Sequence, residues 1–257
     1  MPEPKILLFD IENSAIKAWV WKCYDTDVIK IIQPWHLLSF AWKWLGEDKA
    51  HVRCLRDYRG YWSNQQNDEP LTRELWGLID QADLIVAHNG DGHDKPKATS
   101  RFAKYQLGMP NPAKQVDTYK ILKREMKIEK NSLDHAAEYF GVGHKLPNVG
   151  FPMWEMCTEG TSKFTKREVN DAWDQMCTYN LHDVDPLLEG VYLAVRPYDK
   201  KHPNLSLFTR TDSCPVCQST KLVLHGWSYL TSGKKQRKTC NSCGHRFSSG
   251  KIIREAA

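Results

Sequence analysis

The first apolar stretch of the chain, KILLFDIENSAI at residues 5–16, constrains the fold most, because it places two carboxylates inside a predicted strand. Residues 5–12 are rich in strand-forming side chains, and in a strand side chains two positions apart share a face. Asp10 and Glu12 therefore point one way, whereas Ile11 between them points the other way. Two buried carboxylates repel each other and are costly unless cations neutralise them. The stretch predicts either a metal site or, if the strand ends at Asp10, a solvated turn.

Two later segments carry acidic residues that are able to join the same site. AHNGDGHDKP places Asp94 after a predicted strand end, near the start of a helix whose first turn suits Pro96. YNLHDVDPLLEGVYL places Tyr179 and Asp183 four positions apart, hence one turn apart on one helical face. Taken alone, the first segment is typical of a helix cap and the second of a surface hydrogen bond.

The motifs D-x-E, HNGDGHD and Y-x-x-x-D, in this order, resemble those of the DEDD superfamily of 3′–5′ exonucleases, the DnaQ-like group with a ribonuclease-H-like fold. The resemblance covers residues from about 5 to 198. It is to the tyrosine branch, since the histidine of the other branch would stand where this chain has Thr178. The resemblance implies that two Mg²⁺ or Mn²⁺ ions are held by four carboxylates and that Tyr179 positions the attacking water. The implied ligands are Asp10, Glu12, Asp94 and Asp183.

The second motif departs from the family pattern. His93 precedes Asp94, where the family usually has an apolar residue, and Asp91 is a rival ligand in a GDG turn. Asn89 is a candidate nucleotide contact, with a structural role in the turn as the alternative. Asp117 and His182 are expected to be structural, and Lys95 and Lys145 to be solvated, with a phosphate contact as the alternative for each lysine.

Hydrophobic periodicity predicts strands first, then strands and helices in alternation, which indicates an α/β fold with a mixed sheet flanked by helices. The expected strands lie near 5–12, 16–23, 35–45 and 50–55, as a meander, and at DLIVAHN. Expected helices are 70–81, the end of QVDTYKILKREM, NSLDHAAEYFGVG closed by Gly141, and 165–195 as two helices or one bent helix.

Two cysteine pairs of identical spacing, CPVC and CNSC, are separated by 22 residues. This C-x2-C…C-x2-C pattern predicts one structural Zn²⁺ in a small ribbon, because each pair presents two thiolates to one ion. Two disulfides are the rival interpretation, which a reducing compartment disfavours. The predicted zinc ligands are Cys214, Cys217, Cys240 and Cys243, and the scattered Cys23, Cys54, Cys157 and Cys177 are expected to be buried thiols.

Aromatic and cationic side chains alternate between the cysteine pairs, in HGWSYLTSGKKQRKT. Rings stack on bases and cations neutralise phosphates in proteins that bind single strands. The alternative is a hairpin whose aromatic residues pack on the ribbon and whose basic turn is solvated. The candidate nucleic-acid-binding residues are Trp227, Tyr229, Lys234, Lys235, Arg237 and Lys238.

Net charge and length indicate two domains, because the whole chain has a net charge of +5 whereas residues 206–257 alone have a net charge of +7. We expect an exonuclease domain at 1–198, a linker at 199–211 and the ribbon at 212–250. No stretch is apolar enough to span a bilayer, and a cytoplasmic location is expected.

The predicted function is removal of nucleoside monophosphates from the 3′ end of single-stranded DNA. An exoribonuclease and an inactive nucleic-acid-binding adaptor are the alternatives, and a DNA polymerase or replication protein is an expected partner. The acidic set followed by a ribbon is also similar to small exonucleases encoded by bacteriophages, which would place it in host cytoplasm.

Overall fold

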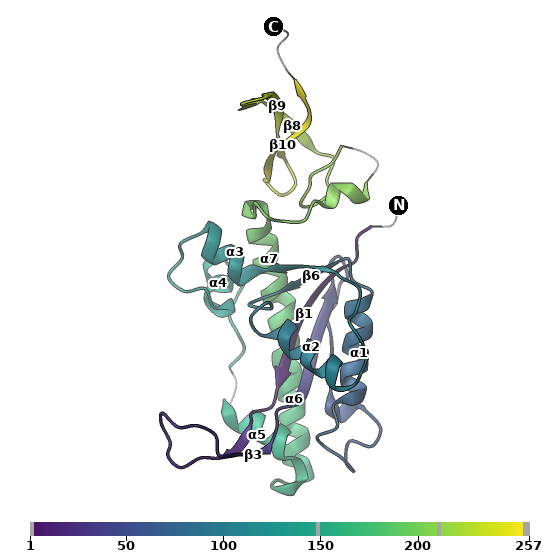
Figure 1. Cartoon of the computed structure of the whole chain (residues 1–257), viewed down its shortest axis with the longest axis vertical. Coiled ribbons are helices and arrows are strands. Elements are labelled where there is room, and N and C mark those ends of the chain that lie inside the picture. The colour runs from purple at the N-terminus through teal and green to yellow at the C-terminus, as the bar shows by residue number, and fades with distance from the viewer. Residues whose placement is uncertain (1–2, 148–149, 210–211, 254–257) are drawn as a thin grey trace.

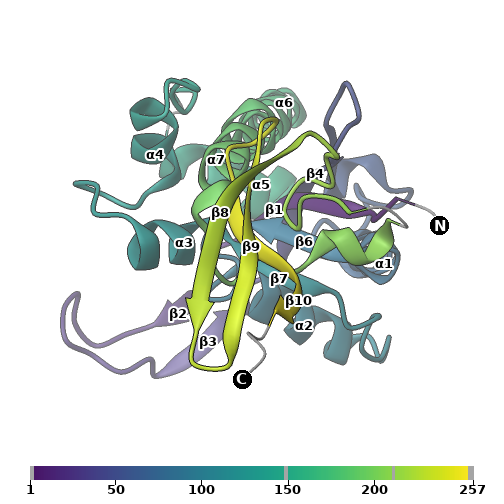
Figure 2. The ribbon, with the colours of Figure 1, turned by 90° about the horizontal axis from the view of Figure 1, so that it is seen from above.

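The computed structural model describes residues 3–147, 150–209 and 212–253, which form a mixed five-stranded sheet flanked by helices and a smaller three-stranded sheet (Figure 1). This is the α/β arrangement with a small C-terminal module that the sequence predicts. Figure 2 shows helices α3 and α4 on one side of the main sheet and α1 and α2 on the other. No helix within the described residues is long and apolar enough to cross a membrane.

The main sheet has β1 at its centre, antiparallel to β4 and parallel to β6. Its side chains alternate between two cores: Leu7, Phe9 and Ile11 enter one, and Ile6 and Leu8 enter the other. The carboxylate-bearing face is therefore apolar at its start and acidic only toward its end. From edge to edge the strands are β5 (His51–Cys54), β4 (Leu37–Trp44), β1 (Ile6–Asn13), β6 (Leu84–Ala87) and β7 (Lys114–Asp117).

Helices cover both faces of this sheet. The first core takes buried side chains from α1 (Glu69–Asp80), α2 (Asp94–Lys104), α5 (Phe151–Glu159) and α6 (Lys166–His182). The second takes them from α3 (Thr118–Glu125), α4 (Leu133–Tyr139) and α7 (Glu189–Val195). Gly141, at φ +70°, follows α4 as expected, because glycine tolerates this left-handed conformation. Helix α5 has no counterpart among the predicted elements.

The helical stretch expected at 165–195 is one bent run. Thr165 and Glu168 form a reciprocal capping box at the start of α6. The turn η3 (Asp183–Leu188) then joins α6 to α7 through a kink at Asp185, whose φ of −132° and ψ of 111° are not helical. Pro186 lies in this turn, and proline has no backbone N–H to continue the regular helical ladder. The bend places Asp183 at the junction of the two helices.

The strand expected at 16–23 is shorter and lies outside the meander. β2 (Lys17–Trp19) pairs only with β3 (Lys30–Gln33), in a two-stranded arm at residues 15–33. The reason is that β4 occupies the edge of β1 from Leu7 to Asn13. The arm is exposed, including Trp21 at 87% exposure and Cys23, which contradicts the expectation that Cys23 is buried.

The C-terminal three-stranded sheet comprises β8 (Leu222–Leu230), β9 (Gly233–Cys240) and β10 (Arg246–Ile253), with β9 in the middle. Residues 212–253, here called the ribbon, lie at one end of the long axis of the molecule and the arm lies at the other (Figure 1). Leu205 is buried against the second core and its N–H donates to the Pro215 carbonyl at 2.7 Å. Of the expected linker, residues 210 and 211 lie outside the described residues.

Candidate active site and metal centres

Three of the four predicted carboxylate ligands gather at one point. Asp10 and Glu12, near the end of β1, and Asp183, where α6 bends, each offer an oxygen within 4.8 Å of the others. All three line a pocket of about 440 Å³, and Asp94 and Asn89 line the same pocket. The structure thus brings together residues from the three predicted motifs.

The pKa values of this cluster reflect its burial and its uncompensated negative charge. Burial, followed by the charges of Asp94 and Glu12, raises the pKa of Asp10 well above its usual value. Burial and the charge of Asp183 raise the pKa of Glu12 to about 7. Burial also raises the pKa of Asp183. Such a cluster is unfavourable unless protons or cations reduce its charge.

The donor set fits a hard divalent cation. Oδ1 of Asp183 is buried and has no hydrogen-bond partner among the described residues. An oxygen of this kind is costly when left unpaired, and carboxylate oxygens are the ligands that Mg²⁺ and Mn²⁺ prefer. Asp10, Glu12 and Asp183 are therefore able to hold such an ion.

Lys145 lies in the site, which contradicts the expectation that it is solvated. Its Nζ donates to Oδ2 of Asp183 at 2.5 Å and to the Tyr179 hydroxyl oxygen at 2.9 Å. Burial lowers the pKa of Lys145, but the charge of Asp183 and the two hydrogen bonds outweigh burial and hold the pKa above its usual value. Lys145 therefore carries a positive charge beside the carboxylates.

Tyr179 lies one helical turn before Asp183, as predicted. Burial raises the pKa of its hydroxyl, so the group is protonated at neutral pH. Its ring meets the ring of Trp154 edge-on, with 5.8 Å between centroids. The hydroxyl therefore has a fixed direction and one proton to donate.

Two residues that sequence reasoning missed hold the carboxylates in place. Nδ2 of Asn180 donates to Oδ2 of Asp10 at 2.7 Å, while its Oδ1 accepts from Ser39 at 3.0 Å. Nε1 of Trp154, on α5, donates to Oε2 of Glu12 at 3.3 Å. The position of Asn180 beside Tyr179 was a usable signal, whereas no sequence signal pointed to Trp154.

Asp94 is the first residue of α2 and is buried, with its Oδ1 accepting from the backbone N–H of Ile11 at 3.3 Å. It lies beside the other carboxylates but outside the group of three. The hydrogen bond to Asp94 raises the pKa of the preceding His93. Asp91, the rival ligand, instead pairs with Nζ of Lys120 at 2.6 Å and does not line the pocket.

Asn89 lines the pocket and shapes the turn after β6. It adopts a φ of +61°, and its N–H donates to Asp117 at 2.9 Å. A side chain on the next residue, Gly90, would place Cβ 2.5 Å from Cβ of Ala87, which cannot move away, so this turn requires glycine. Asp117 is structural, as expected, because it also caps α3.

The four predicted zinc ligands form a second cluster, with all sulfur atoms within 4.8 Å of one another. Sγ of Cys214 lies 3.7 Å from that of Cys243, and Sγ of Cys217 lies 3.6 Å from that of Cys240. Tetrahedral Zn²⁺ with bonds of about 2.3 Å spaces its sulfur ligands about 3.8 Å apart, whereas a disulfide needs about 2.05 Å. The cysteines therefore fit one zinc ion and are not disulfides.

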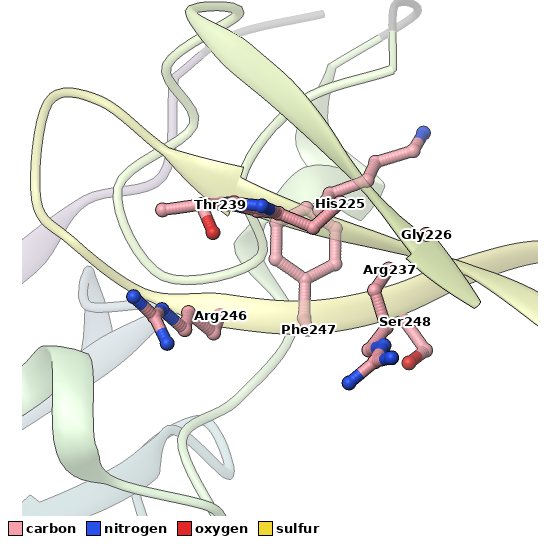
Figure 3. A pocket seen from close by; sticks show the side chains of 8 residues that line it. His225, Gly226, Arg237, Thr239, Arg246, Phe247 and Ser248 are labelled. Carbon is pink, nitrogen blue, oxygen red and sulfur yellow. The ribbon is translucent and has the colours of Figure 1, made fainter. Parts of the chain in front are cut away.

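The predicted nucleic-acid-binding residues of the ribbon have different environments. Nζ of Lys234 lies 5.5 Å from the ring centroid of Trp227, and Lys238 forms an ion pair with Asp212. Tyr229 is exposed. Lys235 lies opposite Ser228 on the neighbouring strand. Arg237 lines a hollow together with three residues that sequence reasoning missed: His225, Arg246 and Phe247 (Figure 3).

Comparison with protein families agrees with this fold. A family model described as the RNase_H superfamily matches residues 45–189. No curated protein matches the chain. Among solved structures, the chain is similar to a family B DNA polymerase from the hyperthermophilic archaeon Pyrobaculum calidifontis, with 19% identity and a TM-score of 0.49. This similarity covers 77% of the chain but only 26% of the polymerase.

Proposed function

Because the chain belongs to the RNase H superfamily, we propose that it is a metal-dependent 3′–5′ exonuclease of the DEDD type, in the tyrosine branch. The family match and the five-stranded mixed sheet support the coarser statement that it is a nuclease with an RNase H-like fold. One observation carries the finer proposal: Oδ1 of Asp183 is buried, has no partner among the described residues, and lies within a group of three carboxylates.

The reaction proposed is hydrolysis of the last phosphodiester of a single-stranded DNA, which releases nucleoside monophosphates from the 3′ end. Two divalent ions, when bound, supply a nucleophilic hydroxide and neutralise charge on the phosphate. Their proposed ligands are Asp10, Glu12, Asp94 and Asp183. Asn180 and Trp154 orient two of these carboxylates through the hydrogen bonds described above.

The remaining residues of the site position the reacting groups. The protonated Tyr179 hydroxyl donates a hydrogen bond to the attacking water. Lys145 holds this hydroxyl and Asp183 in one geometry. Asn89, which lines the same pocket as the carboxylates, contacts the terminal nucleotide.

The ribbon is proposed to bind the nucleic acid further from the cut. Its Cys214, Cys217, Cys240 and Cys243 hold one structural Zn²⁺, and the proposed contacts include Trp227, Tyr229, Lys234, Lys235, Arg237 and Lys238. We take residues 1–198 as the exonuclease domain, 199–211 as the linker and 212–250 as the ribbon. A polymerase or replication protein as partner, and the similarity to cytoplasmic bacteriophage enzymes, belong to this same proposal.

A second candidate is an inactive adaptor that binds nucleic acid through the ribbon. The observation that favours it is the ammonium group of Lys145, which already neutralises Asp183. An exoribonuclease is a further alternative, because the carboxylates do not distinguish a 2′-hydroxyl.

The test is to incubate the protein with single- and double-stranded DNA and RNA labelled at either end, with Mg²⁺, with Mn²⁺ or with neither. Single-stranded DNA should shorten stepwise from its 3′ end only when an ion is added. Asp183→Asn should abolish shortening, whereas Asp171→Asn, an exposed position on the same helix, should not. Shortening from the 5′ end contradicts the proposal, faster shortening of RNA supports the exoribonuclease, and binding without cleavage supports the adaptor.

A further inference from the structure

We infer that one hollow on the ribbon binds the phosphates of a nucleic-acid strand, at a distance from the carboxylates, an inference that rests on the proposed nuclease function. The hollow has a volume of about 480 Å³ and lies on the three-stranded sheet (Figure 3). Ligand sites commonly measure about 300–1,000 Å³. The hollow is therefore large enough for a nucleotide unit of a strand.

Two arginines face the same side of this sheet. Arg246 lies directly opposite Thr239, and Ser248 lies directly opposite Arg237, in the antiparallel pair of β10 and β9. Directly opposed residues share a face, and so do residues two positions apart on one strand. Arg237 and Arg246 therefore project on one face, where His225 from β8 joins them.

Both guanidinium groups are available to a ligand. Arg237 and Arg246 are exposed, and neither forms an ion pair with any residue in the described ranges. Lys238 also lines the hollow but is paired with Asp212, and Lys234 lies over the Trp227 ring. A guanidinium group binds phosphate through two parallel hydrogen bonds, which makes arginine well suited to recognise a phosphodiester.

The net positive charge of the whole ribbon favours a polyanion as the ligand of the hollow. Residues 212–253 contain seven lysines and arginines but one acidic residue, Asp212. Such an excess attracts a phosphate backbone and releases its counterions. Phe247 also lines the hollow, but its ring stacks on His245, with 5.7 Å between centroids, and packs against the cysteine cluster.

The location of the hollow separates binding from chemistry. Asp10 and Glu12 lie near the end of β1 that leads into the arm, whereas the ribbon lies at the other end of the long axis (Figure 1). Phosphates held in the hollow therefore belong to nucleotides remote from the bond being cut. Loss of the hollow should raise KM for a long strand.

The experiment compares two double variants of the full, zinc-loaded chain. Arg237→Gln with Arg246→Gln empties the hollow of its arginines, and Lys221→Gln with Lys251→Gln removes the same charge from the ribbon outside the hollow. Fluorescence anisotropy of a labelled oligothymidine, without Mg²⁺ or Mn²⁺, gives Kd at several NaCl concentrations. Thermal unfolding and zinc content check that both variants fold.

The arginine variant should weaken binding about tenfold and reduce the salt slope of log Kd by about 1.4, since each contact with a single-stranded phosphate contributes about 0.7. The lysine variant should change both quantities much less. Equal effects of the two variants, or no effect of either, would overturn the inference.

Hydrolysis of the p-nitrophenyl ester of thymidine 5′-monophosphate by the wild type tests the carboxylates separately, because this small ester cannot reach the carboxylates and the hollow at the same time. Its failure beside a positive binding result counts against the nuclease and leaves the hollow supported.

Discussion

Nζ of Lys145 lies 2.5 Å from Oδ2 of Asp183, so the carboxylate cluster contains its own positive charge. The two residues are 38 positions apart and come from a loop after α4 and from the bend after α6. The ammonium group balances part of the charge that Asp10, Glu12 and Asp183 place in a partly buried site. The protein is therefore able to keep these carboxylates together before any ion binds.

Removal of this cation should destabilise the ion-free protein. Lys145→Met should lower the free energy of unfolding by about 1–2 kcal/mol, because it leaves a largely buried carboxylate without its partner. Added Mg²⁺ should reduce the difference from wild type, since it supplies the missing positive charge. Urea unfolding with and without Mg²⁺ measures this, with Lys95→Met, which changes an exposed lysine, as the control. A deficit of the same size in both conditions would contradict this role of Lys145.

The buried His36 should make stability depend on pH. Burial lowers its pKa from 6.5 to about 4. Below pH 6.5 the unfolded chain binds a proton that folded His36 does not, so stability is complete above this pH and is lost as pH falls toward 4. The loss attributable to His36 should reach at most about 3 kcal/mol.

His36→Asn should flatten this part of the profile, because asparagine is able to keep the hydrogen bond to Ser14 without titrating. Urea unfolding at a series of pH values measures the effect. His51→Asn, at a half-exposed position, should retain the wild-type slope. An unchanged slope in His36→Asn would be evidence against the buried neutral imidazole.

Asn180 should affect turnover without being a ligand. Its amide fixes Oδ2 of Asp10, and loss of such an orienting partner typically costs about 10–100-fold in activity or metal affinity. Asn180→Ala should therefore lower kcat and raise the Mg²⁺ concentration needed for half-maximal activity. Thr178→Ala on the same helix, whose hydroxyl donates to the Asp174 carbonyl, is the matched control. Equal activity of the two variants would show that Asn180 does not support catalysis by orienting Asp10.

Zinc removal should unfold the ribbon and leave the main sheet intact. The buried hydrophobic cluster of the ribbon consists of two zinc ligands, Cys214 and Cys240, and Val216, so the metal supplies much of the ribbon's stability. Cys240→Ser should lose the bound zinc and the slow hydrogen exchange of β8, β9 and β10. Mass spectrometry of zinc content and hydrogen exchange measure this. Cys23→Ser, at an exposed free thiol, should keep both properties.

Much of the fold and the grouping of the acidic residues could be predicted because the signals are local. The period of two in β1 put Asp10 and Glu12 on one face, and the helical spacing put Tyr179 one turn from Asp183. The cysteine spacing predicted a cluster that the sulfur distances fit. Asp94 was assigned through the resemblance to the DEDD superfamily, since a strand end and a helix start alone indicate a cap, and it lines the same pocket as the other carboxylates.

The remaining features depend on contacts between distant segments. Lys145 follows a turn that has no periodicity, and Trp154 reaches Glu12 across 142 positions. Strand propensity placed β2 correctly as extended chain, but pairing of β4 with the whole edge of β1 decided that β2 lies in the arm. Likewise, the hollow is formed by residues from three paired strands, which the order of basic residues does not show.

The separation of ribbon and carboxylates along the molecule has one more consequence, for substrate length (Figure 1). A strand that ends at Asp183 and also reaches Arg246 must extend over much of the main sheet. Shorter oligonucleotides reach only one of the two places at a time. The affinity for a single strand should then rise in a step at the strand length that first reaches both the carboxylates and the ribbon.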